Sequence, residues 1–276
     1  MKRLVYPLML LLCSSLFGQS VPYGYNEAAG KYFDVGNDTK LYYEEYGEGA
    51  PLLMLHGGVF GYIDEFEYLI PKLAERYRVV CLATRGHVKS DVGTEPYTYE
   101  QRATDAYKLI QFLDLEKVTV IGFSDGGFAA YKLAAMYPDV VEKVVAMGAG
   151  DDPPSDLPGT SSYSAAELMA DYGDHFEKRV ANMPEPERWS ESLDMLNVLY
   201  NTSSVSKETF EKITCPVLVM SGDGDEYSDP GENVAAHAYL PDSRLSIIPG
   251  CGHVILYCDF PAVWASMKAF LGYEDS

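Results

Sequence analysis

Residues 118–127 are Val118-Thr119-Val120-Ile121-Gly122-Phe123-Ser124-Asp125-Gly126-Gly127, and this stretch decides the fold. Its apolar start, VTVI, is typical of a strand that is buried on both faces of a parallel sheet. The helical pattern FAAYKLAAMYP follows at once. A strand-to-helix turn this short needs glycines because the two chain segments approach closely, and it leaves the serine exposed at the carboxyl end of the strand. The stretch therefore predicts that Ser124 is a nucleophile.

The rest of the chain alternates short apolar runs with helical patterns, which favours an α/β fold with a mostly parallel sheet flanked by helices. Eight strands are predicted, at Lys31–Val35, Leu41–Tyr46, Pro51–Leu55, Arg78–Ala83, Lys117–Gly122, Val141–Met147, Val217–Ser221 and Arg244–Ile248. Helices are predicted between them at Glu65–Arg76, Tyr99–Leu113, Gly126–Met136, Glu232–Tyr239 and Pro261–Leu271.

Residues 151–213 break this alternation. They begin with the turn-rich segment DDPPSDLPGTSS and continue with amphipathic patterns. These helical patterns lie around Ala165–Asn182, Glu187–Leu199 and Lys207–Lys212. Some sixty residues without a strand are too many for a plain connection, so we predict a helical cap between two core segments, 21–150 and 214–276. The alternative is an insertion that lies away from the site.

A serine nucleophile needs a base, and the base needs a carboxylate to orient it. His253 ends the glycine-rich segment PGCGH, between the last predicted strand and the last predicted helix. The segment SGDGD follows the strand pattern VLVM and offers Asp225, which we prefer, with Asp223 as the alternative. The chain order Ser, Asp, His is the order associated with α/β hydrolases.

The segment LHGG, after the strand pattern PLLM, is the third element of the predicted site. Acyl transfer needs two donors aimed at the developing oxyanion. The backbone N–H groups of Asp125 and of Gly58, or of Val59 in its place, are the predicted pair. We assign His56 a structural role, and we expect the substrate to contact Asp125, Val59 and Phe123.

The segments LHGG, RGHxKS, GFSDGG, SGDGD and GCGH, in this order, resemble the α/β-hydrolase superfamily over residues 30–272. The resemblance implies an eight-stranded, mostly parallel sheet with a small cap. It also implies site residues, with Ser124 as nucleophile, Asp225 as acid, His253 as base, and Gly58 and Asp125 at the oxyanion hole.

One segment departs from the pattern of this superfamily. Relatives often have Asp-x-Arg-Gly-x-Gly-x-Ser after the fourth strand, whereas residues 83–90 here are ATRGHVKS, without the Asp and the second Gly. Because of this change, the conformation of this loop and the pocket wall that it forms cannot be carried over from the resemblance.

The residue after the nucleophile gives a hint about the substrate. The sequence Ser-Asp-Gly-Gly at 124–127 is similar to that of the valacyclovirase-like hydrolases of amino-acid esters, where the acidic neighbour is linked to binding of the substrate ammonium group. Asp125 is therefore a candidate for that role. The alternative is that its carboxylate only stabilises the positive end of the following helix.

The charge of the 276-residue chain excludes some partners. It has 21 Lys and Arg against 41 Asp and Glu, a net charge of −20. Such a surface repels nucleic-acid phosphates and anionic headgroups, so the expected partner is a small-molecule substrate, cationic or neutral rather than anionic. No CxxC pair supports a zinc site, and no metal or cofactor is expected.

The first 20 residues have the pattern of a cleaved signal peptide. Lys2 and Arg3 precede the apolar run LVYPLMLLL, and small residues follow up to Ser20. This order predicts a secreted or periplasmic protein. Lipid anchoring at Cys13 is disfavoured because a leucine precedes it.

Four cysteines remain after such cleavage, and they allow three full pairings. Cys81 and Cys215 lie in apolar runs and are expected to be buried. Cys251 and Cys258 are seven residues apart and could close a local bridge.

Together these features predict a secreted serine hydrolase that cleaves a small carboxylic ester, thioester or aminoacyl ester through an acyl-enzyme on Ser124. An alternative uses the same three residues on a carbon–carbon bond or an amide. A further alternative is a non-catalytic ligand-binding protein of the same fold.

Overall fold

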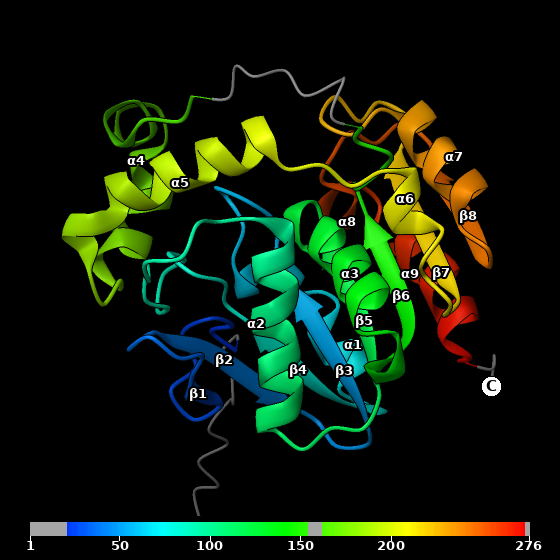
Figure 1. The fold of residues 1–276 in the computed structure, drawn as a ribbon, viewed down its shortest axis with the longest axis horizontal. Coiled ribbons are helices and arrows are strands. Elements are labelled where there is room, and N and C mark those ends of the chain that lie inside the picture. Colours follow the sequence, from blue (N-terminus) through cyan, green and yellow to red (C-terminus); the bar gives the residue numbers. More distant parts are fainter. Residues whose placement is uncertain (1–20, 154–161, 274–276) are drawn as a thin grey trace, which may run out of the picture.

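The computed structural model describes residues 21–153 and 162–273 and contains one eight-stranded sheet (Figure 1). The strands are β1 (Gly30–Asp34), β2 (Lys40–Tyr46), β3 (Ala50–Leu55), β4 (Tyr77–Leu82), β5 (Val118–Phe123), β6 (Val141–Met147), β7 (Val217–Gly222) and β8 (Ser243–Ile248). Their order is β1-β2-β4-β3-β5-β6-β7-β8; β2 pairs antiparallel with β1 and β4, and all other pairs are parallel. The predicted mostly parallel sheet is confirmed. The predicted signal peptide lies outside the described residues.

Helices cover both faces of this sheet. One face packs against α2 (Tyr99–Phe112), α3 (Asp125–Met136) and α7 (Pro230–Tyr239). The other face packs against α1 (Ile70–Leu73), α8 (Ile255–Cys258) and α9 (Phe260–Leu271). Every residue of β5 is buried, as its continuous apolar pattern predicts for a central strand.

The predicted single helix Glu65–Arg76 is wrong. The structure instead has the 3-10 helix η1 (Ile63–Phe66) and, after a turn, the one-turn helix α1. Pro71 explains the break, since it has no N–H to donate to the carbonyl one turn earlier. A second short 3-10 helix, η2 (Pro138–Val140), leads into β6.

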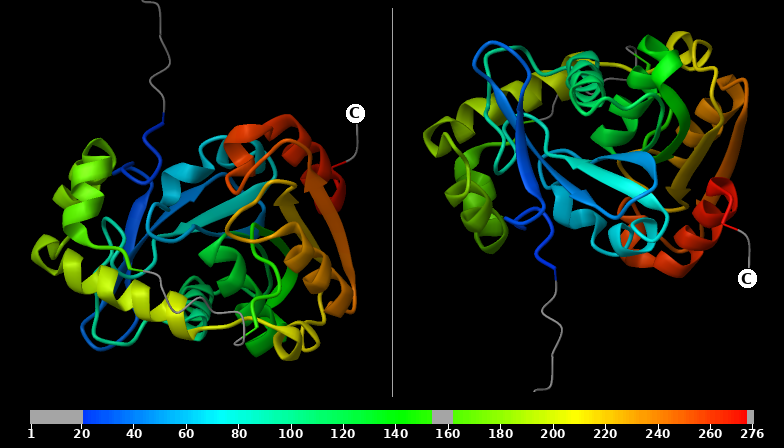
Figure 2. Two further views of the ribbon diagram at one scale, coloured as in Figure 1. Left: turned by 90° about the horizontal axis from the view of Figure 1, so that it is seen from above. Right: turned by 90° about the horizontal axis from the view of Figure 1, so that it is seen from below.

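The helices α4 (Ala165–Ala181) and α5 (Trp189–Thr202), joined through the 3-10 helix η3 (Pro186–Arg188), form the cap. They lie beyond the ends toward which the parallel strands point (Figure 1), and seen from above they lie to one side, with α5 on the side of α2 and α4 toward the β1–β2 edge (Figure 2). Arg179 of α4 ties the cap to the core, because its guanidinium donates to the carbonyl of Gly61 and forms an ion pair with Asp64.

The third helix predicted for the cap, Lys207–Lys212, differs from the expectation. It is the shorter helix α6 (Lys207–Phe210), and it packs against α3 and α7 of the core. Its Phe210 ring is fully buried against the ring of Tyr131. Within residues 21–153 and 162–273, no helix has the length and apolar character needed to cross a membrane.

Candidate active site

Ser124 lies on the sharp turn between β5 and α3, with φ 52° and ψ −120°. A Cβ on Gly122 would collide with the carbonyl of Gly126, and a Cβ on Gly126 would collide with the carbonyl of Leu55. Both positions therefore require glycine: Gly122 because strand and helix approach closely, as the sequence indicated, and Gly126 because the neighbouring strand β3 lies against the turn. The serine side chain is partly exposed, while the residues on either side of it are buried. The turn thus presents one hydroxyl at the carboxyl end of the sheet.

The structure brings the three predicted triad residues together. The ring nitrogen Nε2 of His253 lies 3.0 Å from Ser124 Oγ, and Nδ1 lies 2.9 Å from both carboxylate oxygens of Asp225. Because Nδ1 faces a carboxylate, it carries the proton, and Nε2 is left to accept the serine proton. The ring of Phe123 packs on the His253 ring, 5.0 Å between centroids.

Asp225 and Asp223, the two candidates for the acid, have different partners. Asp225 is 4 % exposed, and besides His253 it accepts the backbone N–H groups of Tyr227 and Ser228. Asp223 accepts the backbone N–H of Gly250 and so ties its own loop to the histidine loop. The geometry therefore assigns the orienting position to Asp225.

The loop that carries the predicted oxyanion donor is fixed by His56. His56 Nδ1 donates to the carbonyl of Gly57 at 2.8 Å, and its Nε2 accepts the backbone N–H of Thr84. The structural role predicted for this histidine is confirmed. The Gly57 carbonyl and the Gly58 N–H belong to one planar peptide unit, so holding the first also orients the second.

Two further residues hold the same loop, and the sequence analysis missed both. His87 Nε2 lies 3.1 Å from the Gly58 carbonyl and its Nδ1 lies 3.0 Å from the Arg85 carbonyl, so a neutral ring donates to one of these two oxygens. Glu65 accepts the Gly57 N–H at 2.6 Å. Burial lowers the pKa of His87 to about 3, so its ring is neutral at pH 7. Burial also raises the pKa of Glu65 well above its usual value. His87 lies in the RGH segment singled out above, but no spacing rule connects it with Gly58.

Asp125 has partners that the sequence did not reveal. Its side chain is 6 % exposed, lies 3.2 Å from the guanidinium of Arg102 on α2, and accepts the hydroxyl of Tyr200 on cap helix α5 at 2.9 Å. Arg102 is itself 3 % exposed. The carboxylate is therefore already balanced by a buried cation. This arrangement disfavours the ammonium-binding hypothesis and makes Asp125 a contact between core and cap.

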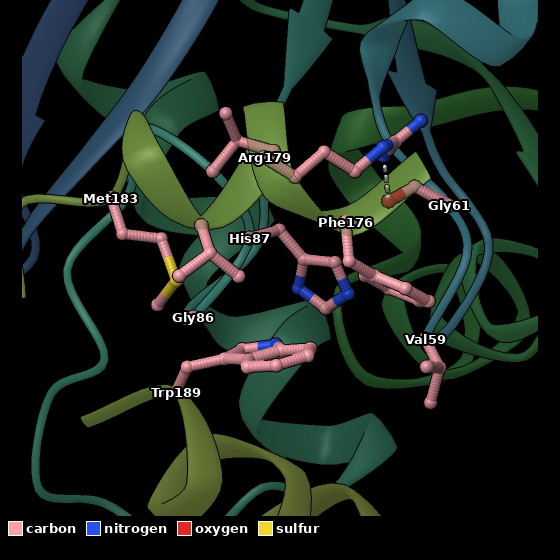
Figure 3. A pocket seen from close by; sticks show the side chains of 10 residues that line it. Val59, Gly61, Gly86, His87, Phe176, Arg179, Met183 and Trp189 are labelled. Carbon is pink, nitrogen blue, oxygen red and sulfur yellow. Dashed lines mark hydrogen bonds between the residues drawn. The ribbon is translucent and has the colours of Figure 1, made fainter. Parts of the chain in front are cut away.

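Val59 and Phe123, the other two predicted substrate contacts, are placed differently. Phe123 is 6 % exposed and lies beneath His253. Val59 lines a small cavity between core and cap, of about 20 Å³, together with His87, Phe176 and Trp189 (Figure 3). This volume is enough for about one water molecule. Ser124 does not line this cavity.

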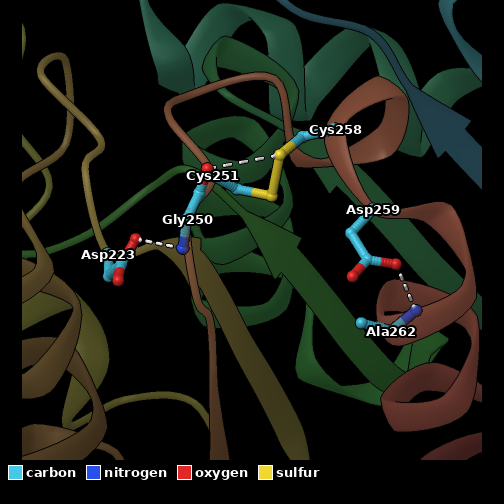
Figure 4. Close-up of a disulfide and its surroundings, with 6 residues drawn as sticks. All are labelled: Asp223, Gly250, Cys251, Cys258, Asp259 and Ala262. Carbon is cyan, nitrogen blue, oxygen red and sulfur yellow. Dashed lines mark hydrogen bonds between the residues drawn. A yellow bond between two sulfur atoms is a disulfide. The ribbon is translucent and has the colours of Figure 1, made fainter.

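A disulfide joins Cys251 and Cys258 and so closes the local bridge that the spacing allowed (Figure 4). The two other cysteines within the described residues are free; Cys81 is buried, as expected, but Cys215 is only partly buried. In the described ranges, no group of three or more His, Cys, Asp or Glu residues is arranged to hold a metal ion.

Comparison with known proteins places this geometry in a family. The profile of the alpha/beta hydrolase fold matches residues 50–176. A human protein, "Serine hydrolase BPHL", is 26 % identical over 232 residues, which are 79 % of this chain and 78 % of that protein. A Pseudomonas putida protein, "2-hydroxy-6-oxononadienedioate/2-hydroxy-6-oxononatrienedioate hydrolase 2", is 27 % identical over 257 residues, 78 % of this chain and 86 % of that protein.

Solved structures agree in fold. An esterase from Exiguobacterium antarcticum has a TM-score of 0.71 at 24 % identity, covering 88 % of this chain and 99 % of that one. A hydrolase from Pseudomonas aeruginosa has a TM-score of 0.73 at 20 % identity, covering 90 % of this chain and 100 % of that one. Together with the strand–Ser124–helix turn and the sheet order, the solved structures show the α/β-hydrolase fold, and the sequence matches support the α/β-hydrolase superfamily as the family of this chain.

Proposed function

We propose that the protein is a serine hydrolase that cleaves a small carboxylic ester or thioester through an acyl-enzyme on Ser124. The observation that carries this proposal is the continuous chain of hydrogen bonds from Ser124 through His253 to Asp225. Such a chain activates a hydroxyl that is otherwise a weak nucleophile. Relatives named as hydrolases, including the human serine hydrolase, support the reaction class.

In this proposal, Ser124 Oγ attacks the substrate carbonyl while His253 Nε2 takes the serine proton. The backbone N–H groups of Gly58 and Asp125 stabilise the oxyanion. Collapse of the tetrahedral intermediate breaks the ester bond, and His253 gives its proton to the leaving alcohol or thiol. Water then attacks the acyl-enzyme with His253 again as base, which releases the acid and restores Ser124.

The test is labelling of the purified protein with a fluorophosphonate, together with turnover of p-nitrophenyl acetate and butyrate. We expect labelling of the wild type and none of Ser124→Ala. The matched acid variants are Asp225→Asn, expected to lose most activity, and Asp229→Asn, expected to keep it, because Asp229 only caps α7. A folded protein that neither labels nor turns over any ester would instead favour the ligand-binding alternative.

A second candidate reaction, hydrolysis of a carbon–carbon bond, has support from the relatives. The Pseudomonas putida relative is named for hydrolysis of a 2-hydroxy-6-oxo dienedioate. The same triad would serve, but the leaving group would then take its proton on carbon. A panel of acyl esters, aminoacyl esters and vinylogous 1,5-diketones separates the two, since kcat/KM should be highest for the true class.

We further propose that the protein is exported. The charge and apolar pattern of residues 1–20 supports this, and so does the disulfide between Cys251 and Cys258, because such bridges persist in oxidising compartments. Mass spectrometry of the protein from its native host is the test. We expect the mature chain to begin near Val21, and an N-terminus that retains Met1 would contradict export by cleavage.

A further inference from the structure

The catalytic histidine candidate lies inside the loop that the disulfide closes. Cys251 precedes His253 by two residues, and Cys258 ends α8, five residues after it. Gly250 and Gly252 stand on either side of Cys251, and Gly250 has φ +74°. Glycines give a chain more conformational freedom than other residues, so the segment 250–252 that leads into His253 is the part of the loop that a restraint at Cys251 would hold in place.

The same bridge is joined to the loop that carries Asp225. The carbonyl of Cys251 accepts the backbone N–H of Gly224 at 2.9 Å. The N–H of Gly250 donates to Asp223 at 2.7 Å (Figure 4). A Cβ on Gly222 would collide with the Cys251 carbonyl. The backbone around Cys251 is therefore fitted against the acid loop, and the disulfide fixes the other side of the histidine loop to it.

We propose that the Cys251–Cys258 disulfide is a positioning element for His253, and that the rate of catalysis depends on its oxidised state. This inference rests on the proposed function. We expect the fold to survive loss of the bridge, because Ile255 and Leu256, which follow His253, are almost fully buried and anchor the second half of the loop to the core. Reduction is therefore expected to loosen His253 while the protein stays folded.

The bridge is open to reduction from one side. Cys258 is exposed, whereas Cys251 is 1 % exposed. A thiolate that attacks Sγ of Cys258 forms a mixed disulfide and releases the Cys251 thiolate, which takes up a proton. A second thiol then frees Cys258, so that two thiols are oxidised to one disulfide as the protein bridge is reduced to two cysteines.

The experiment compares three proteins: the oxidised wild type, the wild type reduced with dithiothreitol, and a double variant that carries both Cys251→Ser and Cys258→Ser. Active sites are counted by fluorophosphonate titration, and kcat is expressed per titrated site. We expect reduction and the double variant to lower kcat about tenfold to a hundredfold, since small displacements of a catalytic group have effects of this size. KM should change little, and re-oxidation should restore the rate of the wild type only.

Three controls make the result decisive. Cys215→Ser leaves the bridge intact, so it should respond to dithiothreitol like the wild type. Circular dichroism shows whether the reduced wild type stays folded, which covers the case in which the double variant fails to fold. Mass spectrometry after alkylation of an aliquot verifies that Cys251 and Cys258 are reduced.

Two results would overturn the inference. One is a reduced, folded enzyme whose kcat per site stays within twofold of the oxidised enzyme. The other is a loss of titratable sites with unchanged kcat for those that remain, because this would show a role in folding alone. If no ester is turned over and no probe labels Ser124 in the oxidised protein, the proposed function fails, and this inference with it.

Discussion

Ser124 holds a backbone conformation that residues with a Cβ rarely adopt. Its φ of 52° and ψ of −120° are expected to cost about 1–3 kcal/mol. The backbone N–H of Ser124 donates to Met147 at 2.7 Å, and its carbonyl accepts the N–H groups of Gly127 and Phe128. The turn is thus held from both sides, which keeps the side chain pointed at His253.

The first prediction concerns this serine and its base. Ser124→Ala and His253→Ala should each lower kcat by about three to six orders of magnitude, because the nucleophile and its base act as a unit. Neither change touches the core, so the urea midpoint should stay close to that of the wild type. Steady-state kinetics with p-nitrophenyl butyrate measures the effect. Rates within tenfold of the wild type would contradict the triad assignment.

The second prediction concerns Asp125. Asp125→Asn removes the charge that balances Arg102, and an uncompensated buried charge costs about 3–5 kcal/mol. We therefore expect a large loss of stability in urea unfolding. The kcat/KM values for aminoacyl and plain acyl esters should fall by similar factors.

The control for Asp125 adds Arg102→Leu to the same chain. Removing both charges should restore most of the lost stability, since no unpaired ion is left in the core. If Asp125→Asn instead raised KM selectively for aminoacyl esters and left stability unchanged, the ammonium-binding hypothesis would be correct and the ion-pair interpretation wrong.

At the scale of the element, the loop after β3 that carries the predicted oxyanion donor Gly58 is held in place by neutral histidines. His56 donates to the Gly57 carbonyl, the His87 ring lies within hydrogen-bond distance of the Gly58 carbonyl, and burial lowers the pKa of both histidines. An unfolded chain binds a proton on histidine near pH 6.5, whereas native His87 does so only near pH 3. The contribution of neutral His87 to the free energy of unfolding is therefore complete above pH 6.5 and is lost as the pH falls from 6.5 to 3.

The third prediction follows from this window. The free energy of unfolding of the wild type, relative to His87→Gln, should fall by about 1.4 kcal/mol per pH unit below pH 6.5, or by about 2–3 kcal/mol between pH 7.5 and 4.5. Glutamine can donate to Gly58 but does not titrate. Urea unfolding of both proteins at several pH values measures the difference.

The comparison with His87→Gln is needed because other groups act in the opposite sense. Burial raises the pKa of Glu232 to about 7, so the native state binds a proton that the unfolded state does not, and this favours folding as the pH falls. Glu232 is present in both proteins, so its contribution to the free energy of unfolding cancels in the difference between them. A difference that does not vary with pH would contradict a neutral His87 in the folded state.

At the scale of the whole molecule, the net charge of −20 is expected to raise the local concentration of cations at the surface. The fourth prediction is therefore a salt effect on cationic substrates. The kcat/KM for an aminoacyl ester should fall severalfold to about tenfold between 10 and 500 mM NaCl, because salt screens exposed charges. The neutral acyl ester of the same shape is the control and should change little. Equal responses of the two esters would show that the overall charge does not act on the substrate.

Local patterns in the sequence determined the eight strands and the turn at Ser124. Continuous apolar runs have one favourable place, inside a covered sheet. Gly122 is required by its close contact with Gly126, four residues later, although Gly126 is also required by its contact with Leu55 on β3.

The prediction of one helix over residues 65–76 is wrong because it followed the apolar pattern alone, whereas Pro71 divides the segment. The spacing of Cys251 and Cys258 is compatible with a bridge between them, but it does not distinguish this pairing from the others that four cysteines allow.

Only the tertiary structure decided which groups meet across the chain. It places His253 against Ser124 over 129 residues of sequence and selects Asp225 rather than Asp223 as its partner. It also brings the Tyr200 hydroxyl to Asp125 over 75 residues. These contacts depend on how loops and cap helices pack at one end of the sheet, and no periodicity along the chain encodes that packing. The fold followed from local chemistry, whereas the charge balance of the site followed from packing.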